Sequence, residues 1–207
     1  MKQIENWENI ETNEYVESEK FTLGGKKCKI VNVKNFTYGG IEKISLELDV
    51  IDGDNKGYYQ KRFDERGENA KFWDDGATIS FPAEPTEDKD KSYIKGLVKV
   101  IESYNPNYKW NWDEQTLKDK LINVNFSLKE YEGSDGKIYT KPQVSRFVNS
   151  KENFREDFIP SVKTLDNGFV KYEDYKNKQN KSNDPFKDFG DTVEVSSDEL
   201  PFDDFQI

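Results

Sequence analysis

Apolar and polar side chains alternate from Glu42 to Ile51, and this pattern constrains the fold more than any other feature of the chain. The apolar positions of the segment are Ile44, Leu46, Leu48 and Val50, and the polar positions between them are Ser45, Glu47 and Asp49. A period of two is typical of a strand with one face on a core and the other in water. We therefore expect a β-rich domain around a single core.

The rest of the chain supplies the other elements of such a domain. Strands are expected over residues 26–36, 56–64, 121–131 and 137–148, a short strand over 78–81, and helices over 92–104 and 114–120, the second capped by Asp113. The phase of Val31 and Val33 differs from that of Cys28 and Ile30, which predicts a β-bulge. The order strand, strand, strand, helix, strand, strand is that of the OB-fold, a five-stranded barrel. The expected fold class is thus mainly β with one or two helices.

The net charge of −10 is unevenly distributed. Residues 1–19 carry −5 and residues 184–207 carry −7, so residues 20–183 carry +2. A slightly basic body can bind phosphates while an acidic tail competes for the same groove. Low hydrophobicity with high charge predicts disorder at the acidic end, and KNKQNKSNDPF, within residues 172–186, is typical of a linker. We expect an acidic segment over 1–19, a binding domain over 20–165, and a disordered linker and acidic tail over 166–207.

The last ten residues, DELPFDDFQI, combine acids with apolar side chains. The residues expected to contact a partner protein are Asp198, Glu199, Leu200, Pro201, Phe202, Asp203, Asp204 and Phe205. In one interpretation the apolar side chains enter a pocket whose rim carries Lys and Arg. In the other, the tail only makes the protein soluble. Apolar clusters inside an acidic run favour the first interpretation.

This tail, placed after a β-rich body, resembles that of bacterial single-stranded DNA-binding proteins. The body segments GGKKCKIVNVK, KGYYQKRF and YIKGLVKVIESYNPNYKWNWDE are similar to those of the same proteins in phages of Gram-positive bacteria. The resemblance implies a protein that coats single-stranded DNA in phage replication or recombination and recruits partners through its acidic tail. One departure is that residues 203–207 follow Phe202, whereas the bacterial chains end at the Pro-Phe.

Residues 56–64, KGYYQKRFD, interleave aromatic rings with cations. Rings stack on bases and cations contact phosphates, so single strands require this combination. Only one face of a strand can stack, and the other completes the core. Three aromatics at period two in NPNYKWNWDE form either a second stacking patch or a plug at a barrel end. With the loops over 37–41 and 132–137, the expected DNA-binding residues are Lys34, Tyr38, Tyr58, Tyr59, Lys61, Arg62, Phe63, Tyr108, Trp110, Trp112, Lys137, Tyr139, Lys141 and Arg146.

The composition argues against an enzyme. The chain has no His and one Cys, Cys28, so imidazole catalysis and cysteine zinc clusters are excluded. Two local groups of acids, Asp49 with Asp52 and Asp54, and Asp74 with Asp75, leave a two-metal nuclease formally open. Solvated acids in turns explain both groups. We expect no catalytic residue, no metal and no cofactor.

The remaining expectations concern the cellular compartment, the oligomeric state and an alternative function. A lone Cys, no signal peptide and no 18-residue apolar stretch predict a protein of the cytoplasm, that of the host cell if a phage encodes it. The oligomeric state stays open between monomer and homodimer. The alternative function is a phage protein whose acidic surface mimics DNA and inhibits a host enzyme.

Overall fold

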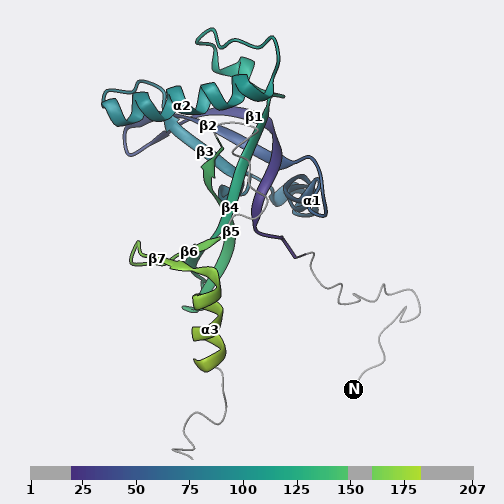
Figure 1. Ribbon diagram of the computed structural model, residues 1–207, viewed down its shortest axis with the longest axis vertical. Coiled ribbons are helices and arrows are strands. Elements are labelled where there is room, and N and C mark those ends of the chain that lie inside the picture. The colour runs from purple at the N-terminus through teal and green to yellow at the C-terminus, as the bar shows by residue number, and fades with distance from the viewer. Residues whose placement is uncertain (1–19, 149–159, 183–207) are drawn as a thin grey trace, which may run out of the picture.

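The computed structural model describes residues 20–148 and 160–182, and within these ranges the chain forms a seven-stranded sheet with three α-helices (Figure 1). The strands are β1 (Gly24–Tyr38), β2 (Ile41–Val50), β3 (Thr78–Pro82), β4 (Leu121–Glu132), β5 (Ile138–Phe147), β6 (Ser161–Lys163) and β7 (Phe169–Lys171). The helices are α1 (Tyr58–Glu65), α2 (Asp88–Tyr104) and α3 (Tyr172–Ser182), with short 3₁₀ turns η2 (Gly67–Asn69), η3 (Asp75–Ala77) and η4 (Glu114–Leu117). The mainly β prediction is confirmed.

The sheet is mixed and open. Its order is β3-β2-β1-β4-β6-β7, and β5 pairs with β4 from Val124 to Glu132 along the opposite edge of that strand. All ladders are antiparallel except the short one between β4 and β6. Among the described residues β3 and β5 share no ladder, so hydrogen bonding does not close the sheet into the five-stranded barrel that the sequence predicted.

Helix α2 covers one end of the sheet with the apolar stripe that the sequence predicted. Ile94, Leu97 and Ile101 are buried in the core, which the inward side chains of β1 to β4 complete. The helix begins at Asp88, four residues before the predicted start. The predicted helix over 114–120 is shorter, a 3₁₀ turn, although Asp113 caps it by accepting a hydrogen bond from the backbone N–H of Gln115 at 3.0 Å.

The bulge predicted in the first strand is confirmed. The register between β1 and β2 shifts between Ile30 and Asn32. The extra residue turns the strand, so Ile30 and Val33 both point into the core although they are three positions apart in the sequence.

The strand predicted over residues 56–64 is wrong, because this segment forms helix α1. The N-terminus of α1 is fixed by the Asp49 carboxylate, which accepts a hydrogen bond from the Tyr59 N–H at 3.0 Å. Tyr58 and Tyr59 are 8% and 2% exposed and pack against the Phe21 ring. The third strand is β3, close to the short strand predicted over 78–81, so the predicted order of elements holds with a different third member.

The folded part extends beyond the predicted domain end at residue 165. Strand β6 pairs with β4, and β7 pairs with β6. The segment predicted as a linker from Tyr172 is helix α3, whose Tyr175 hydroxyl donates to a Glu130 carboxylate oxygen at 2.6 Å. The acidic segments predicted over 1–19 and 184–207 lie outside the described residues. None of the helices in the described ranges combines the length and the apolar character that crossing a bilayer requires.

Candidate nucleic-acid interface

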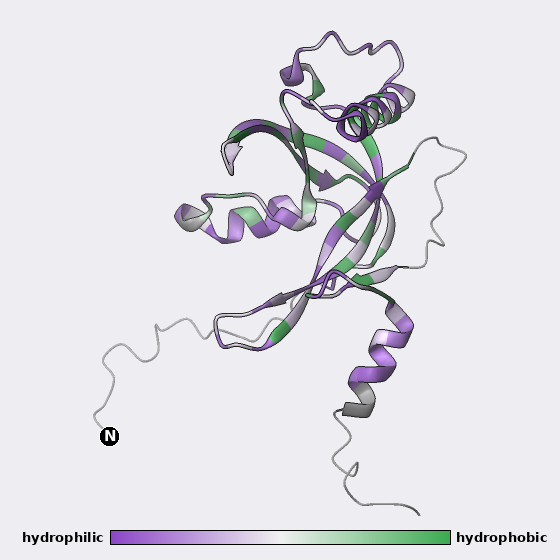
Figure 2. Cartoon of the chain, turned by 90° about the vertical axis from the view of Figure 1, so that its left-hand side faces the viewer, coloured by the Kyte–Doolittle hydropathy of each residue, from purple (hydrophilic) through white to green (hydrophobic). Residues whose placement is uncertain are grey.

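Two hairpins extend from the sheet on the side away from α2. Figure 2 shows their tips on the left, with α1 between them. Gly39 and Gly40 form the β1–β2 tip with φ values of 60° and 77°, a conformation that favours glycine in a tight hairpin turn. The β4–β5 tip spans residues 133–137. The loops that the sequence predicted at the edges of a binding face therefore lie on the same side of the molecule.

The β4–β5 hairpin carries a pair of exposed tyrosines. Tyr131 and Tyr139 are cross-strand partners with ring centroids 5.8 Å apart, and they are 39% and 43% exposed. The Lys141 ammonium lies 5.3 Å from the Tyr131 ring centroid. Exposed rings beside a cation can stack on bases while the cation contacts a phosphate. We call Tyr131, Tyr139 and Lys141 the tyrosine pair and its lysine.

The turn fixes one ring of the pair. The Tyr139 hydroxyl donates a hydrogen bond to the Asp135 carboxylate at 2.8 Å, and the Lys137 N–H donates to the same side chain at 3.1 Å. The Tyr139 hydrogen bond lowers the pKa of the Asp135 carboxyl, and Asp135 in turn raises the pKa of Tyr139. The orientation of the Tyr139 ring is therefore set before any ligand binds.

The segment between β2 and β3 is fastened to the same hairpin. Lys141 forms an ion pair with Asp75 of η3. The next residue, Gly76, lies so close to β5 that a Cβ there would be 2.0 Å from the Pro142 carbonyl oxygen. A side chain at position 76 would force the two segments apart, so glycine permits this contact. The contact joins η3 to β5 beside the tyrosine pair.

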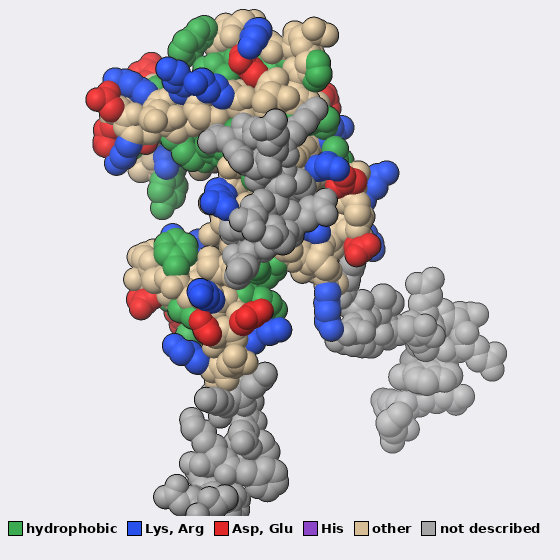
Figure 3. Space-filling view, in the orientation of Figure 1, with side chains coloured by type: hydrophobic (Ala, Val, Ile, Leu, Met, Phe, Trp, Pro, Cys, Tyr) green, Lys and Arg blue, Asp and Glu red, His purple; other side chains and the backbone are tan. Residues whose placement is uncertain are grey.

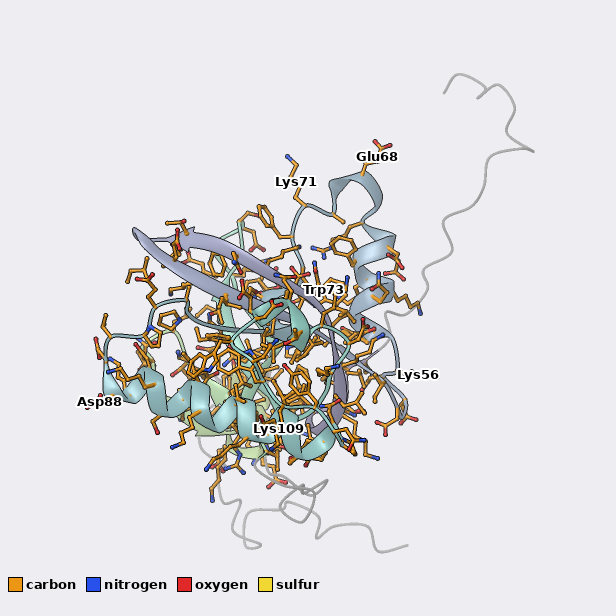
Figure 4. The ribbon with its side chains drawn as sticks, turned by 90° about the horizontal axis from the view of Figure 1, so that it is seen from above. Lys56, Glu68, Lys71, Trp73, Asp88 and Lys109 are labelled. Carbon is orange, nitrogen blue, oxygen red and sulfur yellow. The ribbon has the colours of Figure 1, made fainter. Side chains whose placement is uncertain are left out.

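Helix α1 and the residues after it contribute packing more than exposed rings. The Phe63 and Trp73 rings lie 5.3 Å apart, and the Trp73 indole N–H donates to the Leu48 carbonyl at 3.0 Å. In Figure 4 Trp73 points into the body, whereas Glu68 and Lys71 project away from it.

The two predicted cations of α1 differ in their contacts within the protein. Arg62 donates to the Tyr58 hydroxyl at 3.3 Å and lies 4.0 Å from Asp74. Lys61 is exposed on α1.

The β1–β2 hairpin presents a second exposed ring. Tyr38 is 70% exposed, and the Lys43 ammonium lies 5.1 Å from its ring centroid. Lys34 differs, because it pairs with the buried Glu47 carboxylate at 2.7 Å, which neutralises its charge. Of the two predicted residues on this hairpin, Tyr38 is the one available to a ligand.

The structure removes Tyr58 and Tyr59 from the predicted stacking set. The sequence pattern placed one of them on a strand surface, but both rings complete the core under α1. Their aromatic character serves packing against Phe21 and, for Tyr59, against Phe126.

The predicted set is further divided between two sides of the molecule. Trp110 and Trp112 stack at 4.7 Å beside α2, and the Tyr108 hydroxyl hydrogen-bonds Thr116 at 2.9 Å. Figure 4 shows Lys109 of this segment over α2, on the side opposite Glu68 and Lys71. These three aromatics therefore do not join the hairpin surface.

The two remaining predicted cations lie near the β4–β5 hairpin. Arg146 lines a pocket of about 350 Å³ between β3 and β5 together with Tyr93. Lys137 lies 3.6 Å from the Asp135 carboxylate in the turn.

Sequence reasoning missed Tyr131, Lys43 and the exposed Phe72, which is 77% exposed. Tyr131 could have been found by counting outward from the turn at residues 133–137, because a hairpin places residues at equal distances from its turn opposite each other. Within the described ranges no three acidic or cysteine side chains gather into a cation site. A scan against protein-family models and a search of curated proteins find no match to the chain.

Proposed function

We propose that the protein binds single-stranded DNA across the two hairpins, as an OB-type domain does. The proposal is supported by the order of elements, in which β1 lies between β2 and β4 and α2 connects β3 to β4. In an OB-fold the ligand lies between the loop that joins strands one and two and the loop that joins strands four and five. Both corresponding hairpins extend on one side of this molecule.

One observation carries the proposal: the tyrosine pair and its lysine are exposed and ordered at the hairpin. Exposed apolar side chains that lie together mark interaction sites more often than single exposed ones do. Cross-strand pairing keeps Tyr131 and Tyr139 side by side, so adjacent bases have adjacent platforms. Tyr38 with Lys43 offers a further platform on the other hairpin.

The charges of the surface favour single strands over duplex. Lys141 pairs with Asp75, and Arg62 lies near Asp74, so these two cations are already partly neutralised by acids of the protein. Duplex affinity comes mainly from phosphate contacts, whereas single-strand affinity also comes from stacking. A surface with exposed rings and partly neutralised cations is thus better suited to unpaired bases.

The resemblance in the acidic segment supports the second half of the proposal. We propose that residues 198–205 recruit replication or recombination proteins, with Leu200 and Phe202 in an apolar pocket of the partner. The coating of single strands and the recruitment of partners then reside in separate parts of the chain.

The test is the affinity of the Tyr131→Ala/Tyr139→Ala variant for oligothymidine, measured by fluorescence anisotropy. Each ring that stacks on a base contributes about 1 to 3 kcal/mol, so its loss predicts a weakening of about 5- to 150-fold. Tyr131→Phe/Tyr139→Phe retains both rings and should bind nearly as well as the natural chain. Phe169→Ala is the control, because Phe169 is an even more exposed ring, 72%, and lies on β7 outside the tyrosine pair. Equal affinity of the alanine variant and the control would remove the hairpin from the site.

A further inference from the structure

An apolar groove of about 500 Å³ lies on the outer side of α2, in the size range of ligand pockets. The groove is lined by Pro85, Lys91, Ile94, Lys95, Val98, Lys99, Trp110 and Trp112. Its floor is aliphatic, one wall is the two stacked indoles, and the lysines all belong to α2. The groove shares no lining residue with the tyrosine pair, and the hairpin tips lie on the side away from α2 in Figure 2.

The wall of the groove is strained and exposed. Trp112 has a φ of 70°, which is a rare conformation for a bulky residue, and it is 82% exposed. The Trp110 indole N–H is buried without a hydrogen-bond partner among the described residues. Strain and unsatisfied donors persist in proteins mostly where binding requires them. A large exposed indole such as that of Trp112, on a strained backbone, indicates a surface to which a partner binds.

The rim of the groove is basic. Lys95 and Lys99 have no carboxylate partner in the described part of the chain, and Lys91 has an exposed contact with Asp88 at 3.3 Å. Figure 3 shows Lys and Arg side chains along α2. An apolar floor with a cationic rim selects a peptide that carries both apolar side chains and acids.

We propose that the groove binds residues 198–207 of a second copy of the protein. This segment, DELPFDDFQI, has four acids for the lysines and has Leu200, Phe202 and Phe205 for the apolar floor. Figure 1 shows α2 and α3 at opposite ends of the long axis, and α3 is the described element that precedes the segment. The described chain thus ends, at Ser182 of α3, on the end of the body away from α2, and a second copy can meet the segment head to tail.

The contact is heterologous, because a segment of one copy meets a groove of the next. Contacts of this kind assemble the copies into open filaments, unless the rotation between successive copies closes the assembly into a ring. Such association requires no nucleic acid, so it goes beyond the proposed function. On a single strand it would place successive copies side by side.

The test is sedimentation velocity of the full chain over a range of concentrations, without nucleic acid. We expect the average sedimentation coefficient to rise with concentration, and to rise less as salt screens the lysines. Lys95→Glu/Lys99→Glu and, separately, Phe202→Ala should each weaken association at least tenfold. Lys56→Glu/Lys71→Glu is the matched charge control, because these exposed lysines project away from α2 in Figure 4.

Mixing the two defective variants completes the test. The Phe202→Ala protein retains its groove and the Lys95→Glu/Lys99→Glu protein retains its segment, so the mixture should form a one-to-one complex that neither forms alone. A protein that stays monomeric throughout, a mixture that stays monomeric, or variants that associate normally would overturn the proposal. Oligothymidine affinity of the groove variant is a separate readout: its retention shows that loss of association is not loss of folding or of the proposed function.

Discussion

At the scale of single residues, the tyrosines after Gly57 show why aromatic residues are ambiguous in a sequence. KGYYQKRF has the rings and cations of a binding strand, yet Tyr59 is 2% exposed. The deciding contact is the hydrogen bond from the Tyr59 N–H to Asp49, ten residues earlier in the chain. A pattern of neighbouring residues carries no information about such a partner.

The Tyr59 hydroxyl gives a sharp prediction at this scale. It is buried without a hydrogen-bond partner among the described residues, and burial raises its pKa. Removing an unsatisfied buried hydroxyl relieves its desolvation cost, so Tyr59→Phe should leave the free energy of unfolding unchanged or raise it by about 1 kcal/mol. Tyr59→Ala should lower it by about 3 to 5 kcal/mol through the cavity that remains. Urea unfolding measures both, and a loss above about 1 kcal/mol in Tyr59→Phe would show that the hydroxyl has a partner.

At the scale of elements, the sequence predicted those whose periodicity was clear and missed those that depend on distant contacts. The strands corresponding to β1, β2, β4 and β5, the bulge at Ile30 and the stripe of α2 follow from alternation or from helical spacing. Strands β6 and β7 have three residues each and depend on distant contacts, because β6 pairs with β4 and β7 pairs with β6. Helix α3 is polar, so its sequence resembles a linker until the contact of Tyr175 with Glu130 is known.

Helix α1 yields a prediction about its cap. Asp49→Ala removes the acceptor for the Tyr59 N–H and should destabilise the protein by about 1 to 2 kcal/mol. Asp49→Asn retains a side-chain oxygen at the same place and should cost less. Thermal or urea unfolding of the two variants measures the difference, and equal losses would mean that packing, not the cap, fixes the start of α1.

The same carboxyl has a predictable dependence on pH. Burial raises the pKa of Asp49 above its ordinary value. The folded state therefore takes up a proton before the unfolded state as pH falls, so this group's contribution favours folding more as pH falls through the raised pKa. Asp49→Asn lacks that contribution. The stability of the natural chain relative to Asp49→Asn should rise between neutral and acidic pH, and a relative fall would contradict the raised pKa.

At the scale of the whole molecule, the sheet separates two surfaces. The hairpins and α1 lie on one side, and the groove beside Trp112 lies along α2 on another (Figures 2 and 4). The sequence predicted aromatic residues from both surfaces as one site, because no local pattern shows which side of a sheet a loop returns to. The sequence did predict the loops over 37–41 and 132–137, because each of them joins two strands that pair with each other in a hairpin.

The most direct measurement is the binding of the full chain to labelled oligothymidine of about 30 nucleotides, compared with a duplex of the same length, at about 50 mM salt. We predict a rise in anisotropy with the single strand, an affinity at least about tenfold above that for the duplex, and quenching of tyrosine and tryptophan emission. No rise with the single strand, or equal binding of single strand and duplex, would contradict the claim that the exposed rings of the hairpins bind unpaired bases.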